Sequence, residues 1–368
     1  MTSSDAVHHV SSVIFGLDPM VVATSVLVIA YGFIISEKIN SAVIALLGAC
    51  TLILTGVLNQ HLAVQGIDFN TIFLLIGMMV IVNITKRCGI FQFVAIYAAK
   101  MVRGNPRSLL VMLSLITAVF SALLDNVTTV LLIVPITLLL TEQLKIPAYP
   151  FLFALIFASN VGGTATLIGD PPNILIGSAV GLGFLDFVIN LGPVVFINLV
   201  VLLVLFDLIW GRNFKTSMKA RAHLLRYDPY QALTDIPLLC KSMFTLFMVI
   251  MGFVVGHGYG IEAGTVALAG AAFLMLLDVY KLPSEKQGHQ VQESLAEVEW
   301  ETIFFFMGLF ILVYGVDYTG LLQILAEETL NLTGGDLLIS GMTILWSSAI
   351  LSAIVNNIPF VATMIPLI

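Results

Sequence analysis

Charged residues are scarce in this sequence. Only 10% of its 368 residues are Asp, Glu, Lys or Arg, whereas water-soluble domains carry about 25%. The 15 cationic residues are outnumbered by 22 acidic ones, and they form no basic tract of the kind that binds nucleic acid. This composition excludes both a soluble globular domain and a nucleic-acid partner.

Cysteines are few, and nucleotide-binding motifs are missing. Cys50, Cys88 and Cys240 lie too far apart for a zinc or redox motif and fall in or beside apolar runs. We therefore expect neither a disulfide framework nor a resident metal or cofactor. No Gly-Lys-Ser/Thr sequence is present to bind a nucleotide phosphate, so any use of ATP would require a separate ATPase subunit.

Long apolar runs are abundant instead. Hydrophobic residues make up 59% of the chain and the mean hydropathy is +1.06, and a helix crosses a lipid bilayer with about 20 such residues. We expect an all-α, multi-pass protein of the cell membrane. The apolar runs predict spans near 20–36, 41–57, 71–86, 183–210, 241–257, 263–280 and 301–317. Three further stretches, 90–103, 108–144 and 149–178, are amphipathic or interrupted by polar and helix-breaking residues.

The cations gather in one segment of the chain. Residues 211–240 hold the largest basic cluster, which consists of Arg212, Lys215, Lys219, Arg221 and Arg226. Short loops rich in Lys and Arg face the cytoplasm, so we expect 211–240 to be a cytoplasmic linker. The loop 58–70 contains no cation and is expected on the opposite side of the membrane.

The sequence matches itself at an offset of 231 residues without a gap. Segment 71–135 corresponds to 302–366, and about one position in five is identical over the match, including glycines, an asparagine and a proline. Lys86 and Arg87 of the first copy become Asp317 and Tyr318 in the second. The loss of cations indicates two copies of opposite orientation, an arrangement found in many secondary transporters.

The first polar break interrupts 108–144 at Asp125 and Asn126. About 13 to 15 apolar residues flank it on either side, which is short for a full crossing, so we expect a re-entrant helical hairpin with its tip near the membrane midplane. Asp125, Asn126, Thr128 and Thr129 offer oxygens to a cation such as Na+ and donors to a polar solute. The alternative is that Asp125 only caps the returning helix, although an intramembrane carboxylate costs about 2.5–3.5 kcal/mol to insert.

The second polar break lies in 149–178. Three glycines and a Pro-Pro pair between Ser159 and Asn173 are incompatible with a continuous helix. Unwound backbone is tolerated at membrane depth only where protein or a wet cavity surrounds it, so this segment is a candidate ligand site. The alternative is a tight loop that leaves Asp170 at the surface. The candidate ligand residues of this break are Asn160, Gly162, Gly163, Thr164, Asp170 and Asn173.

The segments Ser121–Pro135, Ser159–Asn173, Trp300–Gly308 and Ser352–Pro366 resemble the ion transporter superfamily, in the branch of arsenite efflux permeases, sodium/proton antiporters, P protein-like and citrate transporter-like proteins. The resemblance implies two inverted-topology repeats, each with a re-entrant helical hairpin and a broken transmembrane helix. It further implies a scaffold part and a mobile transport part, a homodimer and elevator-like alternating access. The family's site residues correspond here to Asp125, Asn126, Thr128, Asn160, Gly162, Gly163, Thr164 and Asp170.

The second copy departs from the family pattern. Asn356 and Asn357 stand where the first copy has Asp125 and Asn126, so the second half-site is less acidic. The second copy also stops at Ile368, inside its hairpin. We expect that the sequence is truncated there and lacks a second broken helix and a closing span.

These features predict four regions. Residues 1–58 are expected to form N-terminal scaffold spans, and 59–210 the core of the first repeat, with its hairpin at about 108–144 and its broken helix at about 149–178. Residues 211–240 would form the basic linker. Residues 241–368 would form the incomplete second repeat, with its hairpin at about 336–368.

A secondary active transporter explains the repeat, the charge reversal and both breaks, and no enzyme activity is expected. The expected substrate is a small inorganic ion or oxyanion, as in arsenite or antimonite efflux or Na+/H+ antiport, coupled to Na+ or H+. A symporter of citrate-like dicarboxylates or divalent anions is the alternative. Neither break contains Lys or Arg, which favours a cation or a neutral oxyacid.

Two other classes of membrane protein explain the sequence less well. An ion channel would share the re-entrant hairpin, but it gives no reason for inverted halves. An intramembrane aspartyl protease could use Asp125 and Asp170, yet Leu167 stands where the Gly-x-Gly-Asp pattern of such enzymes has its first glycine.

Overall fold

The computed structural model describes residue 13 and residues 16–333, 336–353 and 357–365. Within these ranges the chain is built from helices and contains no strand. Seven helical segments are long and apolar enough to cross a membrane, which confirms the prediction of an all-α, multi-pass membrane protein. These are α1 (Pro19–Ser36), α4 (Phe69–Lys86), α6 (Pro106–Leu123), α7 (Asn126–Leu144), α10 with its extension (Phe184–Asn213), α12 with its extension (Ile236–Tyr259) and α15 (Trp300–Tyr318).

The remaining helices are shorter. Five of the seven predicted spans correspond to long helices, whereas 41–57 and 263–280 form the shorter apolar helices α2 and α13. Helix α2 ends early because the chain turns at Gly56, where φ is +84°. The shorter helices are α2 (Ser41–Leu54), α3 (Gln60–Gln65), α5 (Ile90–Met101), α8 (Tyr149–Gly163), α9 (Pro171–Val180), α11 (Met218–Leu224), α13 (Ala263–Val279), α14 (Ser284–Ala296), α16 (Leu321–Thr333), α17 (Leu337–Ser352) and α18 (Asn357–Met364).

The chain divides into two compact units. Unit 1 comprises 1–72 and 299–368, and unit 2 comprises 73–298. The two units are defined by how closely their residues pack, whereas the four regions expected from the sequence are defined by its internal repeat. The units therefore do not test the four regions, which stay a prediction.

Unit 1 is built around a close contact between α2 and α15. A Cβ added at Gly308 would lie 2.6 Å from the carbonyl carbon of Ala45, and one added at Gly48 would lie 2.8 Å from Leu312 Cδ2. Glycine at both positions therefore lets the two helices approach each other closely. The Tyr31 hydroxyl of α1 donates to the carbonyl oxygen of Pro359 in α18 at 2.8 Å.

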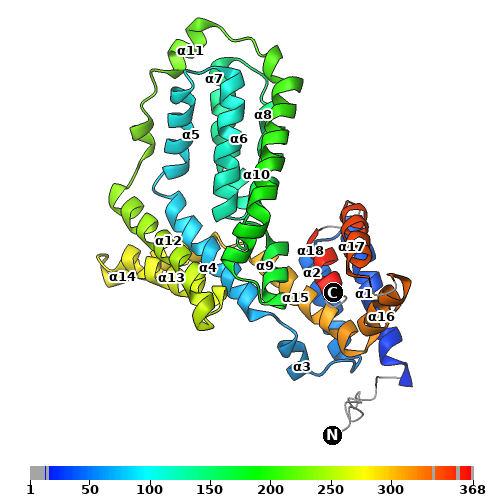
Figure 1. The fold of residues 1–368 in the computed structure, drawn as a ribbon. Helices are drawn as coiled ribbons and strands as arrows, with labels where there is room; N and C mark the ends of the chain where they lie inside the picture. Colours follow the sequence, from blue (N-terminus) through cyan, green and yellow to red (C-terminus); the bar gives the residue numbers. More distant parts are fainter. Residues whose placement is uncertain (1–12, 14–15, 334–335, 354–356, 366–368) are drawn as a thin grey trace. The chain divides into compact units, whose positions relative to one another are not determined.

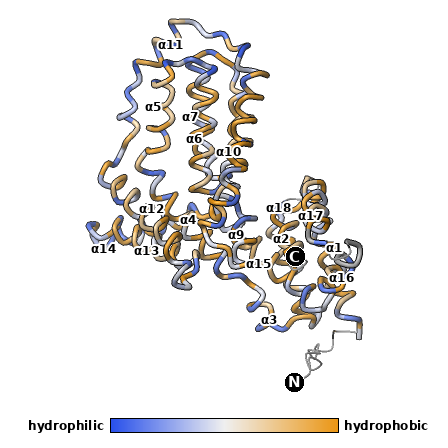
Figure 2. Tube along the Cα trace, in the orientation of Figure 1, coloured by the Kyte–Doolittle hydropathy of each residue, from blue (hydrophilic) through white to orange (hydrophobic). Residues whose placement is uncertain are grey.

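Unit 2 is centred on the hairpin of α6 and α7, which packs against α5 and α8 (Figure 1). Leu109 and Leu113 of α6, Ile133 and Leu140 of α7 and Phe151 of α8 are all buried in one apolar core. Hydrophobic residues predominate along α10, whereas α14 is largely hydrophilic (Figure 2). Burial of this core positions the hairpin tip against the break between α8 and α9.

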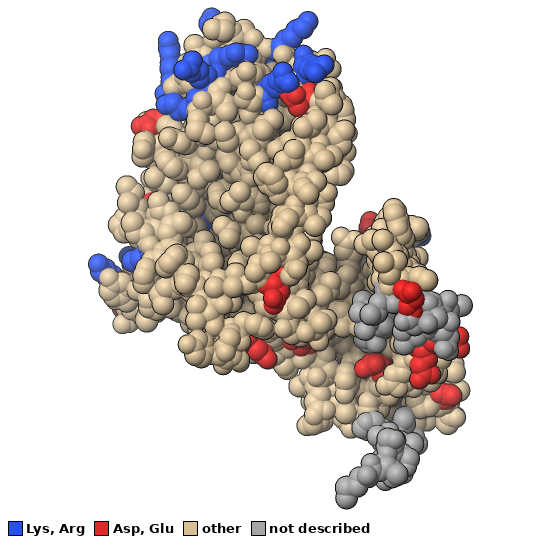
Figure 3. Space-filling view, viewed as in Figure 1, with Lys and Arg blue, Asp and Glu red and all other residues tan. Residues whose placement is uncertain are grey.

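The base of the hairpin is tied to α10 and to the linker that follows it. The Arg107 guanidinium donates twice to the Asp207 carboxylate of α10, and the Thr216 hydroxyl donates to the carbonyl oxygen of Leu144 at 2.7 Å. Lys and Arg gather at this end of unit 2 (Figure 3). Both arms of the hairpin are therefore held at their open ends.

The hairpin arms are longer than the apolar stretches that the sequence offers. Helix α6 has 18 residues and α7 has 19, because each continues through polar residues such as Ser108 and Glu142. At 1.5 Å per residue each arm reaches about 27–29 Å, close to the roughly 30 Å hydrocarbon core of a bilayer. Contrary to what the apolar stretches had indicated, the hairpin arms are therefore not too short to cross the membrane, and the re-entrant path stays a prediction that rests on the resemblance.

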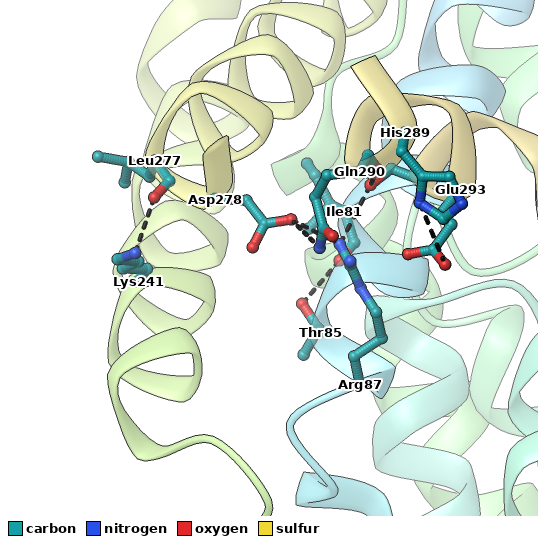
Figure 4. A network of polar contacts seen from close by, with 10 residues as sticks. Ile81, Thr85, Arg87, Lys241, Leu277, Asp278, His289, Gln290 and Glu293 are labelled. Carbon is teal, nitrogen blue, oxygen red and sulfur yellow. Dashed lines mark hydrogen bonds and ion pairs between the residues drawn. The ribbon is translucent and has the colours of Figure 1, made fainter. Parts of the chain in front are cut away.

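A polar network joins α13 and α14 to the end of α4 in unit 2 (Figure 4). Arg87 Nη2 donates to Asp278 Oδ2 at 2.8 Å and to Ser294 Oγ at 3.1 Å. Gln290 Nε2 donates to the same Asp278 oxygen at 3.1 Å. The side chains of Arg87 and Asp278 are 27% and 10% exposed, so this ion pair is largely shielded from solvent.

Candidate functional site

The two polar breaks of the sequence meet in unit 2. The side-chain nitrogen of Asn126 lies 3.2 Å from Asn160 Oδ1 and 3.5 Å from Asp170 Oδ1. Asn126 begins α7, Asn160 lies in the last turn of α8, and Asp170 precedes α9. One amide therefore connects the hairpin tip with both sides of the broken helix.

Asp125 caps α7. Its backbone is extended, with φ −75° and ψ 157°, and its Oδ1 accepts from the backbone N–H of Thr128 at 2.7 Å. This is the standard bond of a helix N-cap. Its second carboxylate oxygen accepts no hydrogen bond from the described residues, so capping leaves that oxygen available to a cation or a proton.

The two threonines of the hairpin tip differ in their surroundings. Thr128 is partly buried and supplies its N–H to the Asp125 cap. Thr129 is fully buried, and its hydroxyl has no partner among the described residues. A buried hydroxyl without a partner costs about 1–3 kcal/mol. A water or a ligand that bonded to the Thr129 hydroxyl would remove this cost.

The helix is interrupted between Gly163 and Pro171, and side chains bond to the freed backbone. Asn173 Nδ2 lies 2.8 Å from the carbonyl oxygen of Thr166, 3.2 Å from that of Thr164 and 3.5 Å from that of Gly163. Asn173 is 8% exposed. In this geometry its amide stabilises the conformation of the unwound segment. That Asn173 also binds a ligand stays a prediction.

Two hydroxyl residues join the hairpin to the broken helix. Ser121 Oγ donates to the carbonyl oxygen of Ser159 at 2.6 Å, and Thr166 Oγ1 donates to that of Ala122 at 2.6 Å. Thr166 also accepts from the N–H of Gly169 at 3.2 Å. Neither Ser121 nor Thr166 was predicted from the sequence as a site residue. A hydroxyl residue beside or within a polar break of an apolar stretch is the sequence feature that could have identified them.

The glycines of the break are needed for packing of the backbone. A Cβ at Gly162 would lie 2.2 Å from the carbonyl oxygen of Ala118 in α6, and one at Gly163 would lie 2.5 Å from that of Gly169. Gly162 and Gly163 were predicted from the sequence as candidate ligand residues. The atoms that require these glycines are instead protein backbone atoms, and a ligand contact at either residue stays a prediction.

A cavity of about 220 Å³ adjoins the break, between α8 and α10. Asn160 and Thr164 line it, together with Asn198 from the middle of α10. Sequence reasoning missed Asn198, although an amide within a long apolar helix is an available signal. The cavity adds this third polar side chain to the surroundings of the predicted site.

The second half-site is only partly described. Asn357 is exposed at the start of α18 in unit 1, whereas Asn356 lies outside the described residues. Over the ranges that the structure covers, no group of three or more His, Cys, Asp and Glu is placed to hold a metal ion. Of the site residues predicted from the sequence, the structure brings together those of the first hairpin and the broken helix.

Comparison with known proteins identifies the family of this chain. A model of the citrate transporter family matches residues 31–368. An uncharacterized transporter of Mycobacterium bovis is 41% identical over 352 residues, which cover 95% of this chain and 80% of the relative. The 46 kDa membrane protein of Mycobacterium leprae is 40% identical over the same shares. The human P protein is 30% identical over 94% of this chain and 50% of its own length. The chain therefore belongs to the citrate transporter family of multi-pass membrane transporters.

Proposed function

We propose that this chain is a secondary active transporter that moves a small inorganic ion or oxyanion by alternating access. The tip of the α6–α7 hairpin and the break between α8 and α9 would form one half of its site. The observation that carries the proposal is the contact of Asn126 with both Asn160 and Asp170. Polar side chains that converge within apolar helices are rare and are typical of substrate and ion pathways.

The chemistry of this half-site favours a cation or a neutral oxyacid. Asp125, Asp170 and the side chain of Asn160 supply oxygen atoms, which are the ligands that hard cations prefer. Neither break contains a Lys or Arg to neutralise an anion. Exchange of Na+ for H+, or efflux of arsenite as the neutral acid, fits this donor set, with the carboxylate of Asp125 as the first candidate to bind the coupling ion.

A dicarboxylate symporter is the second candidate function, because the matching family model is described as a citrate transporter. An anion would then be held by backbone N–H groups at the start of α7. Helix α9 contributes less, since its first two residues are Pro171 and Pro172 and Pro has no N–H. We further propose that the protein works as a homodimer in the cell membrane and that an ATPase subunit is needed only for pump-like transport.

Flux measurements in everted membrane vesicles test the proposal. Vesicles that contain the protein are given Na+, arsenite or citrate, and a pH-sensitive dye reports proton movement. We expect saturable flux of one of these solutes, coupled to H+ or Na+. Single-channel currents would instead indicate a channel, and the absence of flux above that of vesicles without the protein would reject the proposal.

Substitution of Asp125 tests its role in coupling. Asp125→Asn removes the charge but keeps a good N-cap, since Asn caps as well as Asp, so we expect loss or uncoupling of transport in a folded protein. Asp235→Asn is the matched control, because Asp235 caps α12 through the N–H of Leu238 at 2.8 Å. Flux of Asp125→Asn that equals the wild type, with unchanged pH dependence, would reject this role.

A further inference from the structure

A second cavity lies on another side of the hairpin tip. Its volume is about 120 Å³, and its walls come from α4, α5, α6 and α12. Phe120, Leu123 and Leu124 contribute the hairpin wall, and Met243 and Leu246 contribute the wall from α12. Leu124 directly precedes Asp125, so whatever fills the cavity touches the turn that carries the proposed site.

The walls of this cavity offer nothing to a water molecule. Thr85 is its one lining residue with a polar side chain, and the Thr85 hydroxyl donates to the carbonyl oxygen of Ile81 at 2.7 Å within α4. A buried water needs about two to four polar partners, whereas apolar cavities of about 150 Å³ stay dry and bind small hydrocarbons. The chemistry of the cavity therefore selects an apolar occupant.

The cavity adjoins a surface of unit 2 that is rich in exposed apolar side chains. Met243 forms part of its wall and is 38% exposed, and its neighbours Phe244 and Phe247 on α12 are 54% and 63% exposed. In a membrane protein such a surface is covered by the hydrocarbon chains of lipids. A lipid chain is thus the apolar molecule present at the highest concentration beside Met243.

We propose that the end of a lipid acyl chain enters this cavity past Met243 and packs against the hairpin tip at Leu123 and Leu124. The chain replaces dispersion contacts that the walls of an empty cavity lack. An occupied cavity restrains the position of Leu124 relative to α4 and α12. This binding is a property of unit 2 and does not depend on the identity of a transported solute.

Photochemical labelling tests the proposal. The protein is reconstituted into phosphatidylcholine vesicles in which one acyl chain carries a diazirine at its end, and the adducts formed on irradiation are mapped by mass spectrometry. We expect labelling of Leu123, Leu124 or Leu246 that exceeds labelling of the exposed Phe247. Labelling of these wall residues no greater than that of Phe247 would overturn the proposal.

Variants that fill the cavity sharpen the test. Leu246→Trp adds volume on the α12 side, and Met243→Trp does so at the partly exposed entrance, where a misfit is easier to accommodate. Either variant is expected to lose labelling of Leu123 and Leu124, whereas Phe247→Trp on the outer surface of α12 keeps it. Unchanged labelling in a folded filling variant would show that the adducts arise outside the cavity and would overturn the proposal.

A mobility measurement adds a readout that does not depend on labelling yields. A spin label at position 127, where Val127 is 53% exposed in the first turn of α7, reports motion of the tip. Straight-chain lipids are expected to restrain it more than phytanoyl lipids, because methyl branches make the chain wider. The Met243→Trp variant should remove this difference, and equal mobility of the wild type in both lipids would contradict the restraint.

Discussion

Asn126 and Asn160 are joined by a hydrogen bond of 3.2 Å between the side-chain nitrogen of the first and the side-chain oxygen of the second. The two residues lie 34 positions apart in the sequence, in α7 and α8. This bond connects the tip of a helical hairpin with the end of an interrupted helix. It makes the two breaks one structural assembly.

The effects of substituting Asn126 and Asn160 on the free energy of unfolding should not be additive. Asn126→Ala and Asn160→Ala each remove the same bond, so the double variant loses less than the sum of the two. We expect a coupling of about 0.5–1.5 kcal/mol in the free energy of unfolding. A double-mutant cycle by thermal unfolding in detergent measures it, and strict additivity would contradict the contact.

Asp125 should stabilise α7 through its capping hydrogen bond and not through its negative charge. Asp125→Ala removes the acceptor for the N–H of Thr128 and is expected to cost about 0.5–2 kcal/mol of stability, whereas Asp125→Asn retains the cap. Thermal unfolding of the two variants checks this difference. Equal losses in both would show that the negative charge, and not the hydrogen bond, stabilises α7.

Gly162 should not tolerate a side chain. The added methyl group of Gly162→Ala would lie 2.2 Å from the Ala118 carbonyl oxygen, so α6 and α8 must separate, and we expect a loss of about 1–3 kcal/mol. Gly192→Ala is the control, because a Cβ there meets nothing within 4 Å. In that control the higher helix propensity of Ala should leave stability unchanged or raised by up to about 1 kcal/mol, and a similar loss in both would contradict this account.

Arg87 should stabilise unit 2 more than an exposed ion pair does. Arg87→Gln leaves the carboxylate of Asp278 largely shielded with fewer partners, and we expect a loss of about 1–3 kcal/mol. Glu293→Gln is the comparison, because the pair of His289 and Glu293 is 75% and 55% exposed and such pairs contribute at most about 1 kcal/mol. Thermal unfolding of both variants should show the larger loss for Arg87→Gln.

The opposite orientation of the two repeats can be tested by labelling. Lys86 and Asp317 occupy equivalent positions of the two copies. Cysteines introduced at 86 and 317 should react with a membrane-impermeant maleimide from opposite sides of the membrane. Reaction of both from one side would contradict the inverted repeat.

Much of the fold was predictable because bilayer thickness constrains sequence strongly. The long apolar runs predicted α1, α4, α10, α12 and α15, and the two polar interruptions marked the places where helices end. Helix length at the hairpin was not predictable in this way, because α6 and α7 continue through polar residues that apolar runs exclude.

The candidate site was predictable only in its residue types. Asp125, Asn126, Asn160 and Asp170 stand out because polar side chains are costly inside a membrane. The bonds made by Ser121 and Thr166 could not be foreseen, since they join a side chain to backbone groups about 40 residues away. Asn198 was missed because its role depends on the packing of α10 beside α8.

The contacts of the Asn173 amide with three carbonyl groups should limit bending of the interrupted helix. A segment without helical bonds is usually the softest part of a helix, and such a segment can bend. Here Asn173 and Thr166 bind 163–169 to itself and to α6, so we expect the interrupted segment to resist bending. A change in the access of solute to this region would then carry the hairpin and both half-helices together, as one body.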